Sequence, residues 1–170
     1  MKSTQQAFTL IELMVSMLIL SILLMITTPS FGNLLAQNRQ SNHISLIKTT
    51  LAAARGTAIS HDTSVTICPL DGPQCTTNWH EEIYVFIDAN QNKFFDDNDF
   101  IIGMIDSIPS SDSLTYPRSA ITYRADASIA GFQSGSFIYC IKDKPDILGK
   151  RITVSQAGRY RTRDTDCQGK

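Results

Sequence analysis

The sequence has 170 residues, with 15 basic and 16 acidic side chains and a formal net charge of −1 at pH 7. Without the first 30 residues, about 140 remain, which is enough for one soluble domain with its own core and too few for several. No internal repeat or low-complexity tract interrupts the chain, so a repeat architecture is excluded.

The N-terminal segment is apolar from Ala7 to Ile26, and Glu12 is its only charge. Twenty such residues form enough α-helix to cross a hydrocarbon core of about 30 Å. A carboxylate in hydrocarbon costs about 2.5 kcal/mol or more, so Glu12 is expected to have a cationic partner. The segment itself supplies none.

The small residue Ala7 precedes the apolar stretch, whereas a secretory signal peptide carries its small residue after it. Lys2 in the short leader favours a cytoplasmic N-terminus. Phe8-Thr9-Leu10-Ile11-Glu12 after such a leader resembles the signature of type IV prepilins. An ordinary signal anchor with a stray acidic residue is the alternative.

That resemblance implies cleavage of the leader, residues 1–7, by a prepilin peptidase between Ala7 and Phe8, followed by methylation of the Phe8 amine. It implies that residues 8–30 are retained as an inner-membrane anchor and as the core of a fibre of pilins. It also implies that Glu12 pairs with the methylated amine of a neighbouring subunit. Ala7 departs from the glycine usual in the family, and we still expect processing.

Apolar residues at three- and four-residue spacing predict that the helix continues over residues 31–60. Beyond Ser60, runs rich in β-branched and aromatic residues alternate with turn residues and predict antiparallel strands in a head of residues 61–170. The expected fold class is α+β, a type IV pilin fold with a long N-terminal helix packed on a C-terminal antiparallel sheet. The predicted strands are Ser64–Cys68, Ile83–Asp88, Phe100–Ile105, Ala120–Arg124, Ser136–Ile141 and Arg151–Ser155.

The segment from Asp88 to Asp99 has oxygen-bearing side chains at several positions of an EF-hand loop. Lys93 stands where that loop needs glycine, and Asp99 replaces the bidentate glutamate. We therefore favour a polar hairpin turn over a calcium site.

Four cysteines follow the anchor, in the part expected to cross into an oxidising periplasm, and they predict two disulfides. Three pairings are possible, of which we favour Cys68 with Cys75 and Cys140 with Cys167. Zinc bound by cysteines with His61 or His80 is the rival interpretation, but no CxxC spacing supports it. No metal or other cofactor is predicted.

Charge is unevenly distributed. Residues 81–112 contain eight acidic residues and one lysine, whereas residues 150–170 contain six basic residues and two aspartates, which predicts two faces of opposite sign. In an extended strand, Arg159, Arg161 and Arg163 would project from one face and suit a phosphate backbone. The alternative is a solvated edge strand whose charges discourage aggregation.

Anchor, helix, β-rich head and closing Gly-Arg segment together resemble the GspH/FimT family of minor pilins and pseudopilins. FimT-type members are associated with DNA uptake and carry a C-terminal Gly-Arg-x-Arg motif, present here as Gly158-Arg159-Tyr160-Arg161. The resemblance implies a minor pilin that binds double-stranded DNA. The residues expected to contribute are Gly158, Arg159, Arg161, Arg163, Lys170, Lys150 and Arg151.

Two other classes of function are the alternatives to DNA binding. A structural minor pilin, or a type II secretion pseudopilin that primes or caps a fibre, would share the anchor and fold without binding DNA. The sequence contains no GxSxG, P-loop or HExxH motif and no plausible Cys/His dyad, so we expect no enzymatic activity.

Overall fold

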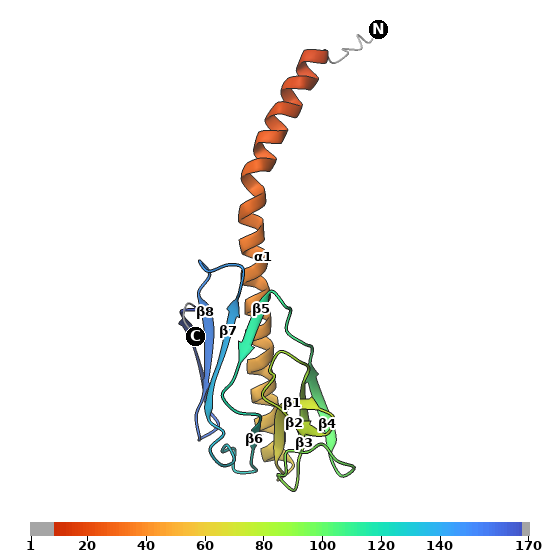
Figure 1. Ribbon diagram of the computed structural model, residues 1–170, viewed down its shortest axis with the longest axis vertical. Helices are drawn as coiled ribbons and strands as arrows, with labels where there is room; N and C mark the ends of the chain where they lie inside the picture. The colour runs from red at the N-terminus through yellow and green to blue at the C-terminus, as the bar shows by residue number, and fades with distance from the viewer. Residues whose placement is uncertain (1–8, 168–170) are drawn as a thin grey trace, which may run out of the picture. The chain divides into compact units, whose positions relative to one another are not determined.

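The computed structural model describes residues 9–167, except for the side chains of residues 26–30. The chain divides into two compact units, residues 1–37 and residues 38–170. Within the described residues, one α-helix, α1 (Leu10–Ser60), begins in the first unit and ends in the second, and nine strands follow it (Figure 1).

The first turn of α1 has its own capping residue. Thr9 precedes the helix, and its Oγ1 accepts a hydrogen bond of 3.4 Å from the backbone N–H of Glu12. A threonine cap followed three residues later by glutamate is the capping-box pattern, and an acidic side chain in the first turn complements the helix dipole. The Glu12 carboxylate thus lies at the end of the helix where its charge is favourable. Ala7 and Phe8 lie outside the described residues.

Large apolar side chains from Leu10 to Ile22 are between 52% and 74% exposed, on every side of the helix. A helix surface that is apolar except for Glu12, Ser16 and Ser21 indicates a segment that is covered by something else. Among the residues that the structure describes, no helix is both long and apolar enough to count as a membrane span. The predicted anchor, residues 8–30, thus remains a prediction.

The part of α1 in the second unit buries a narrow stripe, as the spacing predicts. Ile44, Ile47, Leu51, Ala54 and Ala58 are each at most 6% exposed. After Ser60 the chain closes with a Schellman pattern, in which the N–H of Thr63 bonds to the carbonyl of Ala58 at 3.1 Å. The helix thus ends at the predicted residue.

Two antiparallel sheets make up the rest of the second unit. The first has the order β2-β1-β3-β4, with β6 also paired to β1, and the second has the order β5-β7-β8-β9. The strands are β1 (Val65–Asp71), β2 (Gln74–Cys75), β3 (Ile83–Ile87), β4 (Phe100–Ile105), β5 (Asp112–Thr115), β6 (Ile121–Tyr123), β7 (Gly135–Ile141), β8 (Gly149–Val154) and β9 (Tyr160–Thr165).

All six predicted strands are present, as β1, β3, β4, β6, β7 and β8. β2 and β5 were not predicted, and the segment of β9 was considered only as an extended strand that would align Arg159, Arg161 and Arg163. β2 has only two residues, and β5 opens with an aspartate, a residue depleted in strands.

Aromatic side chains fill the core beneath the sheets. Trp79 is 1% exposed and meets Tyr116 and Phe137 edge-on, with ring centroids 5.3 and 5.0 Å apart. Its indole N–H donates to the carbonyl of Arg118 at 2.8 Å. Trp79 is thus a packing residue with its one polar group satisfied.

Both favoured disulfides are confirmed. Cys68 bonds to Cys75 across the turn between β1 and β2, and Cys140 bonds to Cys167 beyond the end of β9. The thiols of all four cysteines are therefore committed to covalent cross-links.

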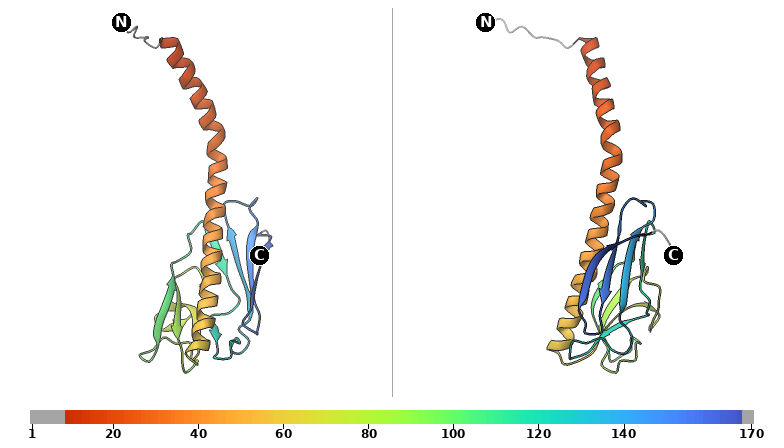
Figure 2. Two further views of the ribbon diagram at one scale, coloured as in Figure 1. Left: turned by 180° about the vertical axis from the view of Figure 1, so that it is seen from behind. Right: turned by 90° about the vertical axis from the view of Figure 1, so that its left-hand side faces the viewer.

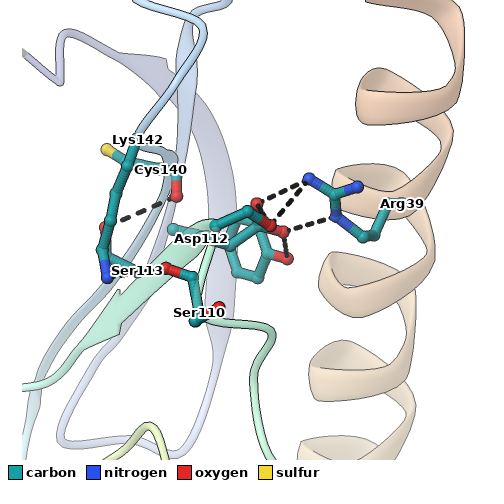
Figure 3. A network of polar contacts seen from close by, with 8 residues as sticks. Arg39, Ser110, Asp112, Ser113, Cys140 and Lys142 are labelled. Atoms are coloured by element: carbon teal, nitrogen blue, oxygen red, sulfur yellow. Dashed lines mark hydrogen bonds and ion pairs between the residues drawn. The ribbon is translucent and has the colours of Figure 1, made fainter. Parts of the chain in front are cut away.

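A buried ion pair joins α1 to the second sheet (Figure 3). Arg39 donates two hydrogen bonds of 2.7 Å to the Asp112 carboxylate, whose side chain has no exposed surface. The Tyr139 hydroxyl donates a third, at 2.5 Å. Burial alone would raise the pKa of Asp112, but these hydrogen bonds outweigh it and hold that pKa below its ordinary value.

The segment from Asp88 to Asp99 is the polar hairpin between β3 and β4. Asp88 is fully buried, and its carboxylate accepts hydrogen bonds from the Thr66 hydroxyl and from the backbone N–H groups of Asn92 and Lys93. The Asp96 carboxylate accepts bonds from Asn90, Asn92 and the N–H of Asn98. These carboxylates therefore hold the turn together.

Candidate nucleic-acid interface

The predicted basic tail forms the last hairpin of the protein, β8–β9, and β9 is an edge strand of its sheet (Figure 2, right). Ser155 and Arg159 close the turn, with a hydrogen bond of 2.9 Å from the N–H of Ser155 to the carbonyl of Arg159. Since β9 pairs only with β8 among the described strands, its other edge is open.

Strand register gathers the arginines on the outer face of this hairpin. Arg151 lies directly opposite Arg163, and Thr153 lies opposite Arg161. These four side chains are exposed, whereas Ile152 and Val154 alternate with them and are at most 1% exposed. Because alternate residues share a face, Arg151, Arg161 and Arg163 form one cationic surface, with exposed Arg159 at the turn.

The outer face is hollowed into a shallow groove of ≈ 450 Å³, lined by Arg151, Thr153, Arg161, Arg163, Asp164 and Thr165. Among the described residues, ion pairs link only Arg39 to Asp112 and Lys150 to Asp164. None of the four hairpin arginines forms an ion pair with a described carboxylate, although Asp164 lines the same groove and is paired with Lys150. Arg151 makes one hydrogen bond, of 3.2 Å, to the Thr165 hydroxyl.

Gly158 has a structural role in the turn. It is buried, its φ is +69°, and a Cβ there would lie 2.1 Å from the carbonyl oxygen of Ala127. Only glycine fits that conformation and that gap. Gly158 thus shapes the turn that presents Arg159, and its own surface is not available to a ligand.

The two lysines predicted to contribute to DNA binding, Lys150 and Lys170, are not part of the arginine surface that the structure describes. Lys150 forms an ion pair with Asp164, its partner in the ladder, and lies on the opposite face from Arg151. It therefore does not extend the arginine surface. Lys170 lies outside the described residues. Tyr160, which is not a predicted contributor, is half-buried opposite Val154.

The Cys140–Cys167 disulfide fixes the far end of the hairpin. It runs from β7 to the residues after β9 and passes over Gly149 of β8, where a Cβ would lie 2.5 Å from the Cys167 sulfur. Three adjacent strands are thereby tied together at the end remote from the turn.

The predicted acidic face is smaller than the sequence suggests. Asp88, Asp99 and Asp112, three of the eight acidic residues in 81–112, are at most 7% exposed and bond to turn backbone or to Arg39. Sequence reasoning also missed a second basic depression around Arg118 and Arg124. No local sequence motif marks Arg118 and Arg124 as a pair. They line one depression only because the tertiary structure brings them together.

A mainly apolar N-terminal helix segment, continued by residues 38–60 that pack on two antiparallel sheets, defines a pilin-type subunit. The model of the prokaryotic N-terminal methylation motif matches residues 2–28. The family described as type II transport protein GspH matches residues 43–158, more than half of the chain, and the protein belongs to that family. It is a type IV minor pilin or pseudopilin of the GspH type, a class that associates with other pilins and with prepilin peptidase.

Two solved structures of the type IV minor pilin FimU from Pseudomonas aeruginosa share this fold. The first has a TM-score of 0.58 at 17% identity and covers 75% of this chain and 90% of its own. The second has a TM-score of 0.54 at 17% identity and covers 75% and 91%. No curated protein sequence matches the chain.

Proposed function

We propose that this protein is a minor type IV pilin that binds extracellular double-stranded DNA through the outer face of the β8–β9 hairpin and supports DNA uptake in natural transformation. The observation that carries the proposal is the register of Arg151 opposite Arg163, with Arg161 and Arg159 following on the same face. A surface strand needs no such alignment of cations for its own folding.

The spacing of these side chains suits a phosphate backbone. Arginines two residues apart in a strand are about 7 Å apart, and directly opposite residues have Cβ atoms about 5 Å apart. Each guanidinium can fork onto phosphate oxygens and release condensed counterions. Phosphate contacts carry no base information, so binding is expected to be indifferent to sequence.

We further propose that residues 8–30 hold the precursor in the inner membrane, with the head in the periplasm, before the subunit enters a pilus fibre or its tip. The exposed apolar surface from Leu10 to Ile22 supports this, because either lipid or neighbouring helices would cover it. Glu12 would then pair with the methylated Phe8 amine of a neighbouring subunit.

The test uses residues 36–170, which contain the whole compact unit of residues 38–170 with its core and both disulfides. Binding to a short labelled duplex is measured by fluorescence anisotropy. Arg159→Gln with Arg161→Gln is expected to weaken binding about tenfold or more, since two charge-assisted contacts are lost.

The matched control is Lys142→Gln with Lys144→Gln, which removes the same charge from the β7–β8 loop, at the end of β8 remote from the turn. It is expected to bind as the parent does. Equal affinity of the arginine variant and the parent would remove the hairpin from the binding site.

The second candidate function is a structural minor pilin or a type II secretion pseudopilin that primes or caps a fibre. The description of the matching family as a type II transport protein favours it. It is distinguished by the same assay, because a purely structural subunit would show no salt-sensitive duplex binding in the parent.

A further inference from the structure

A second basic pocket lies on the head and shares no lining residue with the groove of the hairpin arginines. It has a volume of ≈ 380 Å³, and three cations, Lys93, Arg118 and Arg124, are among the residues that line it. This volume falls within the range of about 300–1,000 Å³ found for small-molecule sites. It is therefore large enough for a ligand rather than for solvent alone.

The charged side chains that line this pocket are all positive. None of its described lining residues is acidic, and none of the three cations forms an ion pair with a described residue. Asp126 lies outside the lining; its carboxylate accepts hydrogen bonds from the N–H and hydroxyl of Ser128 and also interacts electrostatically with Arg124. The pocket is therefore chemically suited to an anion.

An aromatic ring stands at the edge of the same pocket. Phe132 is 92% exposed, the most exposed of the large apolar side chains in the described chain. It follows Gly131, whose φ of +55° turns the chain at this point. A bare phenyl ring beside guanidinium groups offers a stacking surface next to phosphate ligands.

The loop that carries these residues also supports the hairpin turn. The N–H of Ile129 donates a hydrogen bond of 2.9 Å to the carbonyl of Gln156, and the side-chain amide of Gln156 donates to the Ile129 carbonyl. The N–H of the next residue, Ala130, donates a hydrogen bond of 2.8 Å to the Thr122 carbonyl of β6. The loop is thus braced on two elements, so Phe132 projects from an anchored segment.

We propose that this pocket binds single-stranded nucleic acid, with phosphates held by Arg118, Arg124 and Lys93 and an unpaired base stacked on Phe132. Duplex DNA cannot use the ring in this way, because its bases are already stacked and paired. The site thus differs from the hairpin in both ligand and residues, and it does not depend on duplex binding there.

The test measures anisotropy of a labelled oligothymidine of about twelve nucleotides, a length within the site sizes of single-strand binding domains, bound to residues 36–170. Phe132→Ala is expected to weaken binding about 5- to 150-fold, the range found when a stacking residue is removed. Phe132→Trp is expected to restore binding. Because the ring is 92% exposed, the melting temperature should not change.

Arg118→Gln with Arg124→Gln is expected to weaken oligothymidine binding and to flatten its salt dependence by about 1.4 in log–log slope, at about 0.7 for each phosphate on a single strand. Arg159→Gln with Arg161→Gln should impair duplex binding while leaving most of the oligothymidine affinity. If the parent binds no duplex but binds oligothymidine through Phe132, the proposed function fails and this inference stands.

Two results would overturn the inference. One is unchanged oligothymidine affinity in Phe132→Ala, which would leave the exposed ring for contact with another pilin. The other is loss of oligothymidine binding in the hairpin variant alone, which would assign both ligands to the hairpin.

Discussion

The Arg39 guanidinium on α1 donates two hydrogen bonds of 2.7 Å to the Asp112 carboxylate on β5, which is 73 residues away in the sequence. Asp112 has no exposed side-chain surface, whereas Arg39 retains 31%. The pair therefore joins the helix to the sheet that carries the hairpin. Without its partner, Arg39 could still be solvated by water, whereas the buried Asp112 carboxylate could not.

Replacing Arg39 by Gln should lower the free energy of unfolding by about 2–3 kcal/mol, somewhat less than for a fully buried pair because Arg39 is partly exposed. The loss arises because a buried carboxylate is left without its cation. Asp112→Asn is the matched change and should cost about 1–2 kcal/mol, since the amide oxygen can still accept from Tyr139. Urea unfolding of residues 36–170 measures both.

The pH dependence of this pair follows from the lowered pKa of Asp112. A carboxyl whose folded pKa lies below the unfolded value of about 3.9 stabilises fully above that value and loses its contribution as pH falls through the folded pKa. The stability difference between parent and Arg39→Gln should therefore be largest near neutrality and shrink below about pH 4. A difference that grows on acidification would contradict this account.

Gly158→Ala should distort the hairpin turn. The left-handed conformation costs about 1–2 kcal/mol for alanine, and a Cβ only 2.1 Å from the Ala127 carbonyl oxygen adds a clash with backbone. Gly72→Ala is the control, because Gly72 has a φ of +58° but no atom within 4 Å of its Cβ position. Thermal unfolding should show the larger loss for Gly158→Ala, and only that variant should bind duplex less well.

The two disulfides should differ in effect. In the loop-entropy model, a separation of 27 residues for Cys140–Cys167 gives about 3.5 kcal/mol, and a separation of 7 for Cys68–Cys75 gives about 2.5 kcal/mol. Replacing Cys140 and Cys167 by Ala should lower both the melting temperature and duplex affinity, since β9 loses its restraint. Replacing Cys68 and Cys75 by Ala should lower only the melting temperature. Equal effects of the two replacements on duplex affinity would argue against a role of Cys140–Cys167 in holding β9 for binding.

Local sequence patterns predicted the elements whose signals are local. The three- and four-residue spacing from Ile44 to Ala58 gave the buried face of the helix and its end, and period-two alternation gave the face shared by Arg161 and Arg163. Each depends only on the geometry of one element.

Features that depend on distant partners were not predictable in this way. β5 opens with Asp112, which is tolerated in a buried strand because Arg39 neutralises it. From the sequence alone, Lys150 is a cation without a known partner. Strand register places it opposite Asp164, with which it forms an ion pair. Lys93, Arg118 and Arg124 belong to separate loops and meet only in the folded head.

The most direct measurement of the central claim is the salt dependence of duplex binding by residues 36–170. If three or four hairpin arginines neutralise phosphates, the logarithm of the association constant should fall with the logarithm of salt concentration at a slope of about −3 to −4. Arg159→Gln with Arg161→Gln should reduce that slope by about 2, at about 0.9 for each phosphate, and Lys142→Gln with Lys144→Gln should leave it unchanged. A parent slope near zero, or the same slope in the arginine variant, would contradict DNA capture by the β8–β9 hairpin.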